Sequence, residues 1–237
     1  MNGFLIIDKP SGWTSHDVVA KIRHLLSLKK VGHAGTLDPF ATGVLPLCLG
    51  TATKRVSEIT EGEKEYRGVL RLGLETETGD ITGKVMKNFS PPEILFQTDI
   101  ESVLDQFRGE IEQETPRYSA VKYKGRPLHE WARKGIETPV IKRVVKVSEL
   151  KLESLEGNDL TFFVKCSKGT YIRSLLPDIA KALGTCGTVV ALRRLRVGPF
   201  TLKDAVTLEQ LNTHRVKRPS GETPLYNRFF FCYGSPR

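Results

Sequence analysis

Apolar residues recur along the chain with two periods, one typical of strands and one typical of helices. Residues 4–7 are a short apolar run that ends at Asp-Lys-Pro-Ser-Gly, which indicates a strand followed by a turn. Thr14 or Ser15 can then cap a helix whose apolar positions follow a 3.6-residue period at Val18, Val19, Ile22, Leu25 and Leu26. The chain is therefore predicted to open with a strand, a turn and an amphipathic helix.

Further helices and strands interleave along the rest of the chain. Helices are predicted over residues 50–59, over 100–107 with Gly109 as the stop, from Pro127 to Lys134, and over 170–183, where Pro177 indicates a kink or a later start. Strands are predicted over residues 44–49, 64–73, 115–123, 141–154, 160–167 and 189–197. Hairpins are frequent and no steady βαβ order is present. The pattern predicts an α+β fold with a mixed, mostly antiparallel central sheet flanked by helices.

Two of the predicted strands carry arginines. In residues 64–73, Tyr66 belongs to one alternating set and Arg67 and Arg71 to the other, so a half-buried strand with a basic outer face is predicted. Arg193 and Arg194 are adjacent in the strand over 189–197, so they must point to opposite faces of the sheet. One of them can then reach solvent as a phosphate contact, and the other can pair with an inner acid.

The stretch over residues 31–45, Val-Gly-His-Ala-Gly-Thr-Leu-Asp-Pro-Phe-Ala-Thr-Gly-Val-Leu, shows neither period until Val44 and predicts a loop with a fixed path. Glycines permit close approach to a ligand, and Pro39 disfavours helical geometry at Asp38. Asp38 is the only acidic residue between Asp17 and Glu58. It can be a reactive carboxylate at the end of a buried strand, or it can close a turn by bonding its own backbone.

Composition adds a partner to this picture. Lysines and arginines number 36 against 27 acidic residues, and the net charge of +9 favours a polyanionic partner such as nucleic acid. No apolar run approaches the length of a membrane span, and the N-terminus lacks a signal-peptide pattern. The widely spaced cysteines predict reduced thiols, and the histidines lack metal-binding spacing. We therefore expect a cytoplasmic protein that uses no metal and binds no membrane.

Several reaction classes lack their motifs in this sequence. Neither G-x-x-x-x-G-K-[ST] nor G-x-G-x-x-G is present before a helix, and no G-x-S-x-G elbow occurs. What is left is one carboxylate on a shaped loop, basic strand faces, and tyrosines that can either stack on bases or fill the core, at positions Tyr66, Tyr118, Tyr123 and Tyr171. Arg173 can pair with a buried carboxylate or lie on the surface as a cation.

Five segments together resemble the TruB family of tRNA pseudouridine synthases. They are Asp8-Lys-Pro-Ser-Gly-Trp-Thr-Ser15, Gly32-His-Ala-Gly-Thr-Leu-Asp-Pro-Phe-Ala-Thr-Gly-Val-Leu-Pro46, Lys64-Glu-Tyr-Arg67, Thr115-Pro-Arg-Tyr-Ser-Ala-Val-Lys-Tyr-Lys-Gly125 and Lys168-Gly-Thr-Tyr-Ile-Arg-Ser174. They occur in family order and cover about residues 3–205. The segment around Asp38 is long and highly specific.

The resemblance implies that the chain isomerises a uridine in the T-loop of tRNA, at position 55, to pseudouridine. No cofactor is implied, because reactant and product are isomers. The resemblance places the catalytic carboxylate at Asp38, the tyrosine beneath a flipped uracil at Tyr66, and the arginine that pairs with the carboxylate at Arg173. It assigns substrate binding to His33, in the space that the flipped base vacates, to Tyr171 and Leu192 in the uracil pocket, and to Lys9 and Arg193.

The resemblance also implies a domain organisation. It predicts a catalytic domain over residues 1–205 and a short basic tail over 206–237 that lacks the usual small RNA-binding domain. The implied partner is the T-stem-loop of tRNA, and we expect a monomer without an obligatory protein partner. Two other interpretations stay open: a non-catalytic RNA-binding or RNA-folding protein on the same scaffold, and a guide-dependent ribonucleoprotein synthase subunit.

Overall fold

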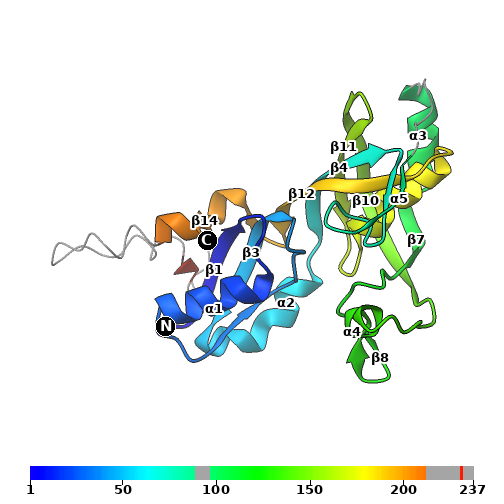
Figure 1. Cartoon of the computed structure of the whole chain (residues 1–237). Coiled ribbons are helices and arrows are strands. Elements are labelled where there is room, and N and C mark those ends of the chain that lie inside the picture. The colour runs from blue at the N-terminus through cyan, green and yellow to red at the C-terminus, as the bar shows by residue number, and fades with distance from the viewer. Residues whose placement is uncertain (89–96, 212–229, 232–237) are drawn as a thin grey trace. The chain divides into compact units, whose positions relative to one another are not determined.

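The computed structural model describes residues 1–88, 97–211 and 230–231, and the chain divides into two compact units (Figure 1). The first unit comprises Met1–Tyr66 and Arg193–Arg237, and the second comprises Arg67–Leu192. Strands β4 (Lys64–Leu72) and β12 (Gly187–Val197) each begin in one unit and end in the other. The boundary that we predicted between residues 205 and 206 separates a catalytic domain from a tail, and it stays a prediction.

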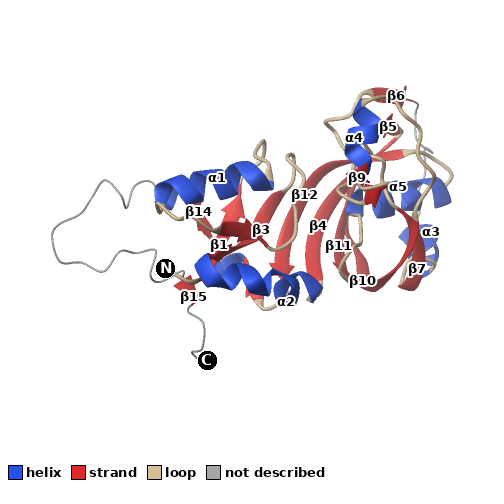
Figure 2. Cartoon of the chain, turned by 90° about the horizontal axis from the view of Figure 1, so that it is seen from below, coloured by secondary structure: helices blue, strands red, loops and turns tan. Residues whose placement is uncertain are grey.

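The first unit is built on a mixed sheet. Besides parts of β4 and β12, its elements are β1 (Gly3–Lys9), α1 (Ser15–Leu25), β2 (Val31–His33), β3 (Thr42–Leu49), the 3₁₀ helix η1 (Gly50–Arg55), α2 (Val56–Glu61), β13 (Phe200–Thr201), the 3₁₀ helix η2 (Leu202–Asp204), β14 (Val206–Thr207) and β15 (Phe230–Phe231). The strand order is β14–β1–β3–β12, with β2 on β3, β13 on β12 and β15 on β1. The pair β1–β3 is antiparallel, whereas β1–β14 and β3–β12 are parallel. Figure 2 shows α1 and α2 next to β1 and β3.

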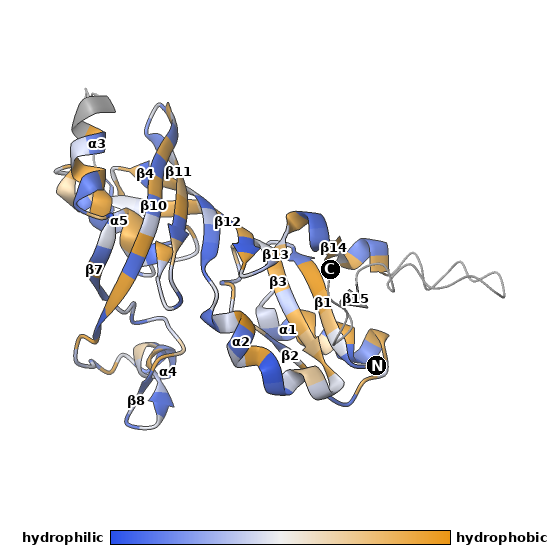
Figure 3. Cartoon of the chain, turned by 180° about the vertical axis from the view of Figure 1, so that it is seen from behind, coloured by the Kyte–Doolittle hydropathy of each residue, from blue (hydrophilic) through white to orange (hydrophobic). Residues whose placement is uncertain are grey.

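The strands β1 and β3 are apolar over most of their length because both of their faces are buried. Figure 3 shows β1 in the hydrophobic colour. One core cluster joins Phe4 and Ile6 of β1 to Val44 and Cys48 of β3 and to Ile59 of α2. Burying an apolar side chain of this size contributes about 1.5–3 kcal/mol. The ends of the segment between β2 and β3 are therefore anchored in a well-packed core.

The second unit carries a predominantly antiparallel sheet. Besides parts of β4 and β12, its elements are β5 (Leu74–Thr76), β6 (Val85–Asn88), α3 (Gln97–Asp105), β7 (Gly109–Glu114), β8 (Lys122–Tyr123), β9 (Arg126–Pro127), α4 (Leu128–Arg133), β10 (Lys142–Glu156), β11 (Asp159–Cys166) and α5 (Ile172–Ala182). The strand order is β12–β4–β11–β10–β7, and β5–β6 and β8–β9 form two separate hairpins. Strand β10 runs antiparallel to both β11 and β7.

The predicted α+β class is confirmed, and so is most of the predicted element order. Thr14, one of the two predicted caps, begins α1: its Oγ1 accepts from Asp17 N at 3.0 Å, and the Asp17 carboxylate accepts from Thr14 N at 2.9 Å. The strand β4 alternates as expected. Its outer arginines are not a free basic face, however, because Arg67 is paired with Glu153 and Arg71 with Asp159.

Two predictions of local structure are wrong. The segment over residues 31–45 begins with a strand, because Val31–His33 pairs with Leu47–Leu49 of β3. Residues 115–123 form a strand only at Lys122–Tyr123. Pro116 has no N–H to give to a ladder, and carbonyls in this segment bond elsewhere: Ser119 O accepts from His129 N.

Two predicted element boundaries shift. The helix α3 ends at Asp105, before Phe107 and the predicted stop at Gly109, and Pro177 lies inside α5. Of the predicted tail, residues 206–211 and 230–231 are described, and the strands β14 and β15 in these ranges both pair with β1. Its basic residues Arg215, Lys217 and Arg218 lie outside the described residues.

Candidate active site

Asp38 lies on the segment between β2 and β3, and the main chain is fixed on both sides of it. Ser15 Oγ accepts from Leu37 N at 2.9 Å and donates to Leu37 O at 3.2 Å. Pro39 O accepts from Gly12 N at 2.8 Å, and Asp38 O accepts from Ala41 N at 3.1 Å. The Asp38 side chain is half-buried. A reactive group is most precisely oriented when its neighbours are fixed in this way.

Arg194 bonds the main chain on both sides of Asp38. Its Nη2 donates to Gly35 O at 3.0 Å, its Nη1 to Thr36 O at 3.2 Å, and its Nε to Val44 O at 2.8 Å. Arg194 is only 1% exposed. Since Ser11 Oγ donates to Phe40 O, every main-chain carbonyl from Gly35 to Phe40 accepts a hydrogen bond.

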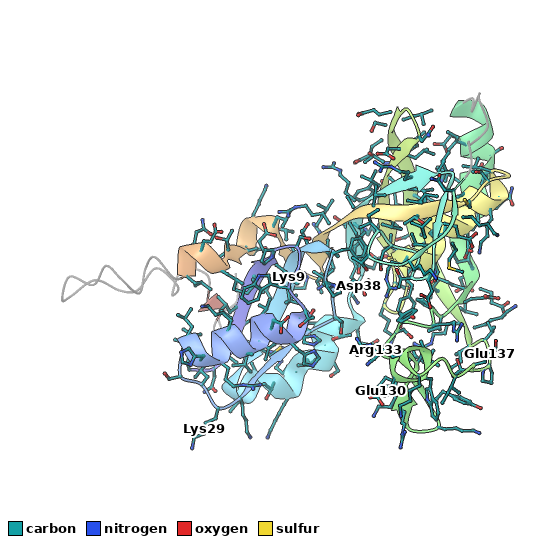
Figure 4. All side chains as sticks on the ribbon, in the orientation of Figure 1. Lys9, Lys29, Asp38, Glu130, Arg133 and Glu137 are labelled. Atoms are coloured by element: carbon teal, nitrogen blue, oxygen red, sulfur yellow. The ribbon has the colours of Figure 1, made fainter. Side chains whose placement is uncertain are left out.

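Lys9 is a second buried cation, at the end of β1. Its Nζ donates to Trp13 O at 2.7 Å, to Pro10 O at 2.8 Å and to Pro39 O at 3.2 Å. Burial lowers the pKa of Lys9 to about 8, with the charge of Asp38 raising it and that of Arg194 lowering it. Figure 4 shows Lys9 and Asp38 on neighbouring segments of the first unit. Lys9 thus holds main chain, and its predicted contact with substrate stays a prediction.

His33 ends β2 with its ring against that of His16, in an edge contact with 5.3 Å between ring centroids. Burial, and then the charges of His16 and Arg194, lower the pKa of His33 to about 4. The imidazole is therefore neutral near pH 7, with one donor and one acceptor nitrogen. Its Nδ1 is buried and makes no hydrogen bond among the described residues.

Arg193 and Arg194 point to opposite faces, as the strand pattern predicts. Arg193 reaches solvent, yet its Nη2 donates to Asp8 Oδ2 at 2.6 Å. The predicted pairing of the inner arginine with an acid is wrong, because Arg194 bonds the three carbonyls described above. A guanidinium has five N–H donors, so carbonyl oxygens can satisfy it where no carboxylate is present. Arg194 is too buried to contact a phosphate in this structure.

Tyr66 belongs to the same unit. It lies in β4 on the buried side of the alternation and is 9% exposed. Its predicted stacking beneath a uracil stays a prediction.

In the second unit, Arg173 occupies the first turn of α5 and is 6% exposed. Its Nη1 donates to Thr78 O and its Nη2 to Tyr118 O, both at 3.0 Å. Its Nε lies 3.6 Å from Asp80 Oδ2. The guanidinium is therefore oriented by a buried carboxylate and two carbonyls of its own unit, and its predicted pairing with Asp38 stays a prediction.

The segment around Asp80 is shaped to meet α5. Asp80 Oδ1 accepts from Thr82 N at 2.9 Å and from Thr78 Oγ1 at 3.0 Å, which closes the turn between β5 and β6. Gly79 has φ +73°, and a Cβ there would lie 2.6 Å from Arg173 O. Only glycine allows this approach, so the position of Asp80 against Arg173 depends on Gly79.

Tyr171 is the N-cap of α5, with its backbone fixed by one side chain. Gln113 Oε1 accepts from Tyr171 N at 2.8 Å, and Gln113 Nε2 donates to Tyr171 O at 3.0 Å. Leu192 is buried on β12, where a Cβ on Gly68 would lie 3.6 Å from its Cδ1.

Arg173 also lines a cavity of about 760 Å³, within the usual size range of ligand pockets.

Sequence reasoning missed Ser15, Asp80 and Gln113 as residues that hold the site. Ser15 carries only the signal of a helix cap, and Asp80 lies in a polar segment that predicts a turn and nothing more. Gln113 carries no signal in the sequence. Within the described residues, no three His, Cys, Asp or Glu side chains gather as metal ligands would. No helix in that part of the chain is long and apolar enough to cross a membrane.

Two family descriptions match the sequence. Residues 23–172 match the N-terminal domain of the TruB family pseudouridylate synthases, and residues 173–227 match the tRNA pseudouridylate synthase B C-terminal domain. The chain belongs to the TruB family. By family the protein is a tRNA pseudouridine synthase, which is an isomerase. The second match extends past residue 206, into the tail that we predicted to lack the C-terminal domain. The match does not decide that prediction, which stays a prediction.

Relatives named tRNA pseudouridine synthase B are similar over most of this chain. The protein of Syntrophus aciditrophicus is 49% identical over 89% of this chain and 67% of its own length. That of Francisella tularensis is 46% identical over 89% and 70%, and that of Hydrogenovibrio crunogenus 43% identical over 91% and 71%.

Solved structures show the same fold. A chain in the crystal structure of a Cbf5–Nop10–Gar1 complex has a TM-score of 0.74 and 34% identity, over 96% of this chain and 58% of its own length. A chain of the archaeal box H/ACA sRNP Nop10–Cbf5 complex has a TM-score of 0.70 and 32% identity, over 96% of this chain and likewise 58% of its own. The chain thus spans little more than half the length of these two solved chains.

Proposed function

We propose that this TruB-family protein converts uridine 55 in the T-loop of tRNA to pseudouridine and that Asp38 is its catalytic carboxylate. The observation that carries the proposal is the fixed main chain around Asp38, where each carbonyl from Gly35 to Phe40 accepts a hydrogen bond. A single carboxylate on so constrained a segment suits chemistry that depends on orientation. The names of the relatives support tRNA as the substrate.

The reaction needs no added redox or group-transfer partner. The N1–C1′ bond of the uridine breaks, the base turns, and a C5–C1′ bond forms. The proton on C5 leaves and N1 gains one, so atoms and charge balance. A carboxylate can attack the sugar or the base as a nucleophile, and it can also move a proton.

The base must leave its stack before it can turn, at a cost of a few kcal/mol. We propose that His33, neutral at the end of β2, occupies the vacated space and that Tyr66 stacks on the uracil. We propose that Tyr171 and Leu192 line the uracil pocket, that Lys9 and Arg193 assist in binding, and that Arg173 acts on the carboxylate. The T-stem-loop is the proposed ligand, and a cytoplasmic monomer is the form in which we expect the protein to act.

The test follows the hydrogen that the reaction displaces. Because C5 exchanges its hydrogen for C1′, tRNA labelled with tritium at C5 of uridine releases tritium as pseudouridine forms. Asp38→Asn should bind tRNA like the wild type and release none, because an amide cannot replace a carboxylate nucleophile. Asp105→Asn is the matched control, since Asp105 is exposed at the end of α3 and pairs with Arg108. It should react like the wild type.

Turnover by the Asp38→Asn variant within roughly tenfold of the wild-type rate would remove Asp38 from the mechanism. Wild-type protein that binds tRNA tightly and releases no tritium would instead favour the interpretation as a non-catalytic RNA-binding protein. Sequencing of the product for pseudouridine would show whether position 55 is the target.

A further inference from the structure

Two side chains outside the substrate assignments hold the main chain that carries Asp38. Arg194 bonds Gly35 O and Thr36 O before Asp38 and Val44 O after it. Ser15 bonds both the N–H and the carbonyl of Leu37, the residue directly before Asp38. Both residues are at most 1% exposed. We call Arg194 and Ser15 the loop clamp.

The chemistry of the loop clamp differs from that of an RNA-binding surface. A buried guanidinium cannot neutralise a phosphate, and neither residue makes a side-chain bond to an acid in the described residues. All the contacts above go to main-chain atoms of one segment. Moving a cation out of water costs free energy. A buried arginine at position 194 therefore needs a role that an apolar side chain could not fill.

The main chains of β12 and β3 approach each other closely beside the loop clamp. Arg194 lies opposite Gly43 in the parallel pairing of β12 and β3. A Cβ on Gly43 would lie 2.2 Å from Arg194 O, and Gly43 has φ +105°. Gly43, after Asp38, is therefore held against the strand that carries the guanidinium, while Ser15 reaches Leu37 from α1. The two residues hold the segment from two different elements.

We propose that Arg194 and Ser15 are positioning residues, which set the orientation of Asp38 through the main chain of residues 35–37. This inference rests on the proposed function for its kinetic consequence only. A lysine at 194 keeps the charge but cannot bond three carbonyls in a planar fork. An alanine at 15 removes both bonds to Leu37 while favouring the helix α1. Either change leaves the Asp38 side chain chemically intact.

The first experiment separates rate from binding. Arg194→Lys and Ser15→Ala are compared with the wild type for tRNA affinity, thermal unfolding, and single-turnover tritium release at saturating tRNA. We expect the rate to fall about 10- to 100-fold, as small misplacements of a reacting group do, with affinity unchanged within about twofold. Arg23→Lys and Ser57→Ala are matched controls. Arg23 is exposed on α1 and bonds Val31 O in β2, not the residues from 35 to 44 that the loop clamp holds, and Ser57 is exposed on α2. Both should keep the wild-type rate.

The second experiment does not depend on activity. Hydrogen exchange followed by mass spectrometry should show faster exchange in the peptide over residues 34–42 for both variants, and unchanged exchange over 142–156 in β10. If wild-type protein releases no tritium, the proposed function fails, and this exchange difference still decides the loop clamp. If Arg194→Lys does not fold, Ser15→Ala decides it alone.

Rates within about twofold of wild type in folded variants would overturn the proposal. So would weaker tRNA binding at an unchanged rate, which would make Arg194 an RNA contact. Unchanged exchange over residues 34–42 would show that the segment does not need the clamp.

Discussion

The two units bury their key arginines in different surroundings. In the first unit, Arg194 bonds three carbonyls, and the nearby Lys9 bonds three more. In the second unit, Arg173 bonds two carbonyls and also faces the buried carboxylate of Asp80. A carbonyl partner fixes the path of the main chain, whereas a carboxylate partner balances charge and orients the guanidinium.

This difference predicts different kinds of failure. Loss of a carbonyl-bound cation leaves neutral acceptors without donors and loosens a segment. Loss of one member of the Arg173–Asp80 pair removes an opposite charge that faces a buried charged group, which costs more. The first unit is therefore organised to hold a segment in place, and the second to hold an arginine in place.

The largest expected effect follows from Arg173→Lys. Lysine keeps the charge and loses the planar fork, so it cannot meet Thr78 O, Tyr118 O and Asp80 together. We expect single-turnover pseudouridine formation to slow by about 100-fold or more, with tRNA affinity changed only modestly. Arg71→Lys, at an exposed pair with Asp159 in the same unit, is the control and should keep its rate. A weaker binder with an unchanged rate would make Arg173 a phosphate contact.

Asp80→Asn tests the charge balance directly. The amide is the same size, but it leaves Arg173 buried without the carboxylate of Asp80. We expect the free energy of unfolding in urea to fall by about 1–3 kcal/mol. Asp159→Asn breaks the solvent-exposed pair with Arg71 and should cost less than about 1 kcal/mol. Equal losses in the two variants would show that the buried pair contributes no more than a surface pair.

The sequence predicted the fold better than the contacts within the site. Periodicity and capping are local signals, so α1 with its Thr14 cap and the hairpin β10–β11 could be read directly. The short strand Val31–His33 could not, because it exists only through its pairing with β3. Pairing across the sheet is a tertiary effect that no local period reveals.

The residues of the candidate site show the same difference between local features, which the sequence reveals, and tertiary contacts, which it does not. Asp38 stands out because a lone carboxylate on a loop of small residues is a local feature. Val44, a partner of Arg194, is 150 residues away from it in sequence, and Thr78, a partner of Arg173, is 95 residues away. Spacing indicated that one arginine of the pair at 193 and 194 would be buried, but not that carbonyls would satisfy it. Asp80 was hidden for the same reason, in a segment whose composition predicts only a turn.

The smallest expected effect concerns His33, which lies beside the loop clamp. His33 is uncharged near pH 7, so it extends the comparison of the two units beyond their buried charged side chains. The pKa of His33 is about 4 in the folded chain, because of burial and then the charges of His16 and Arg194, against an ordinary value of 6.5. Between about pH 6.5 and 4, His33 therefore binds a proton in the unfolded chain and does not bind one in the folded chain. Stability from this group is complete above that window and is lost as the pH falls through it.

His33→Asn removes the titration, so wild type should lose about 1–2 kcal/mol relative to the variant between pH 7 and pH 4, after allowance for solvent screening. Urea unfolding across this range measures the difference, and NMR of the imidazole reports the pKa itself. Parallel stability curves would mean that His33 is protonated as easily in the folded chain as in the unfolded one. Neither burial of the ring nor the charges of His16 and Arg194 would then disfavour its protonated form. In Arg194→Lys, where the charge stays but the loop loosens, we expect the pKa of His33 to rise toward its ordinary value, because water then reaches the ring.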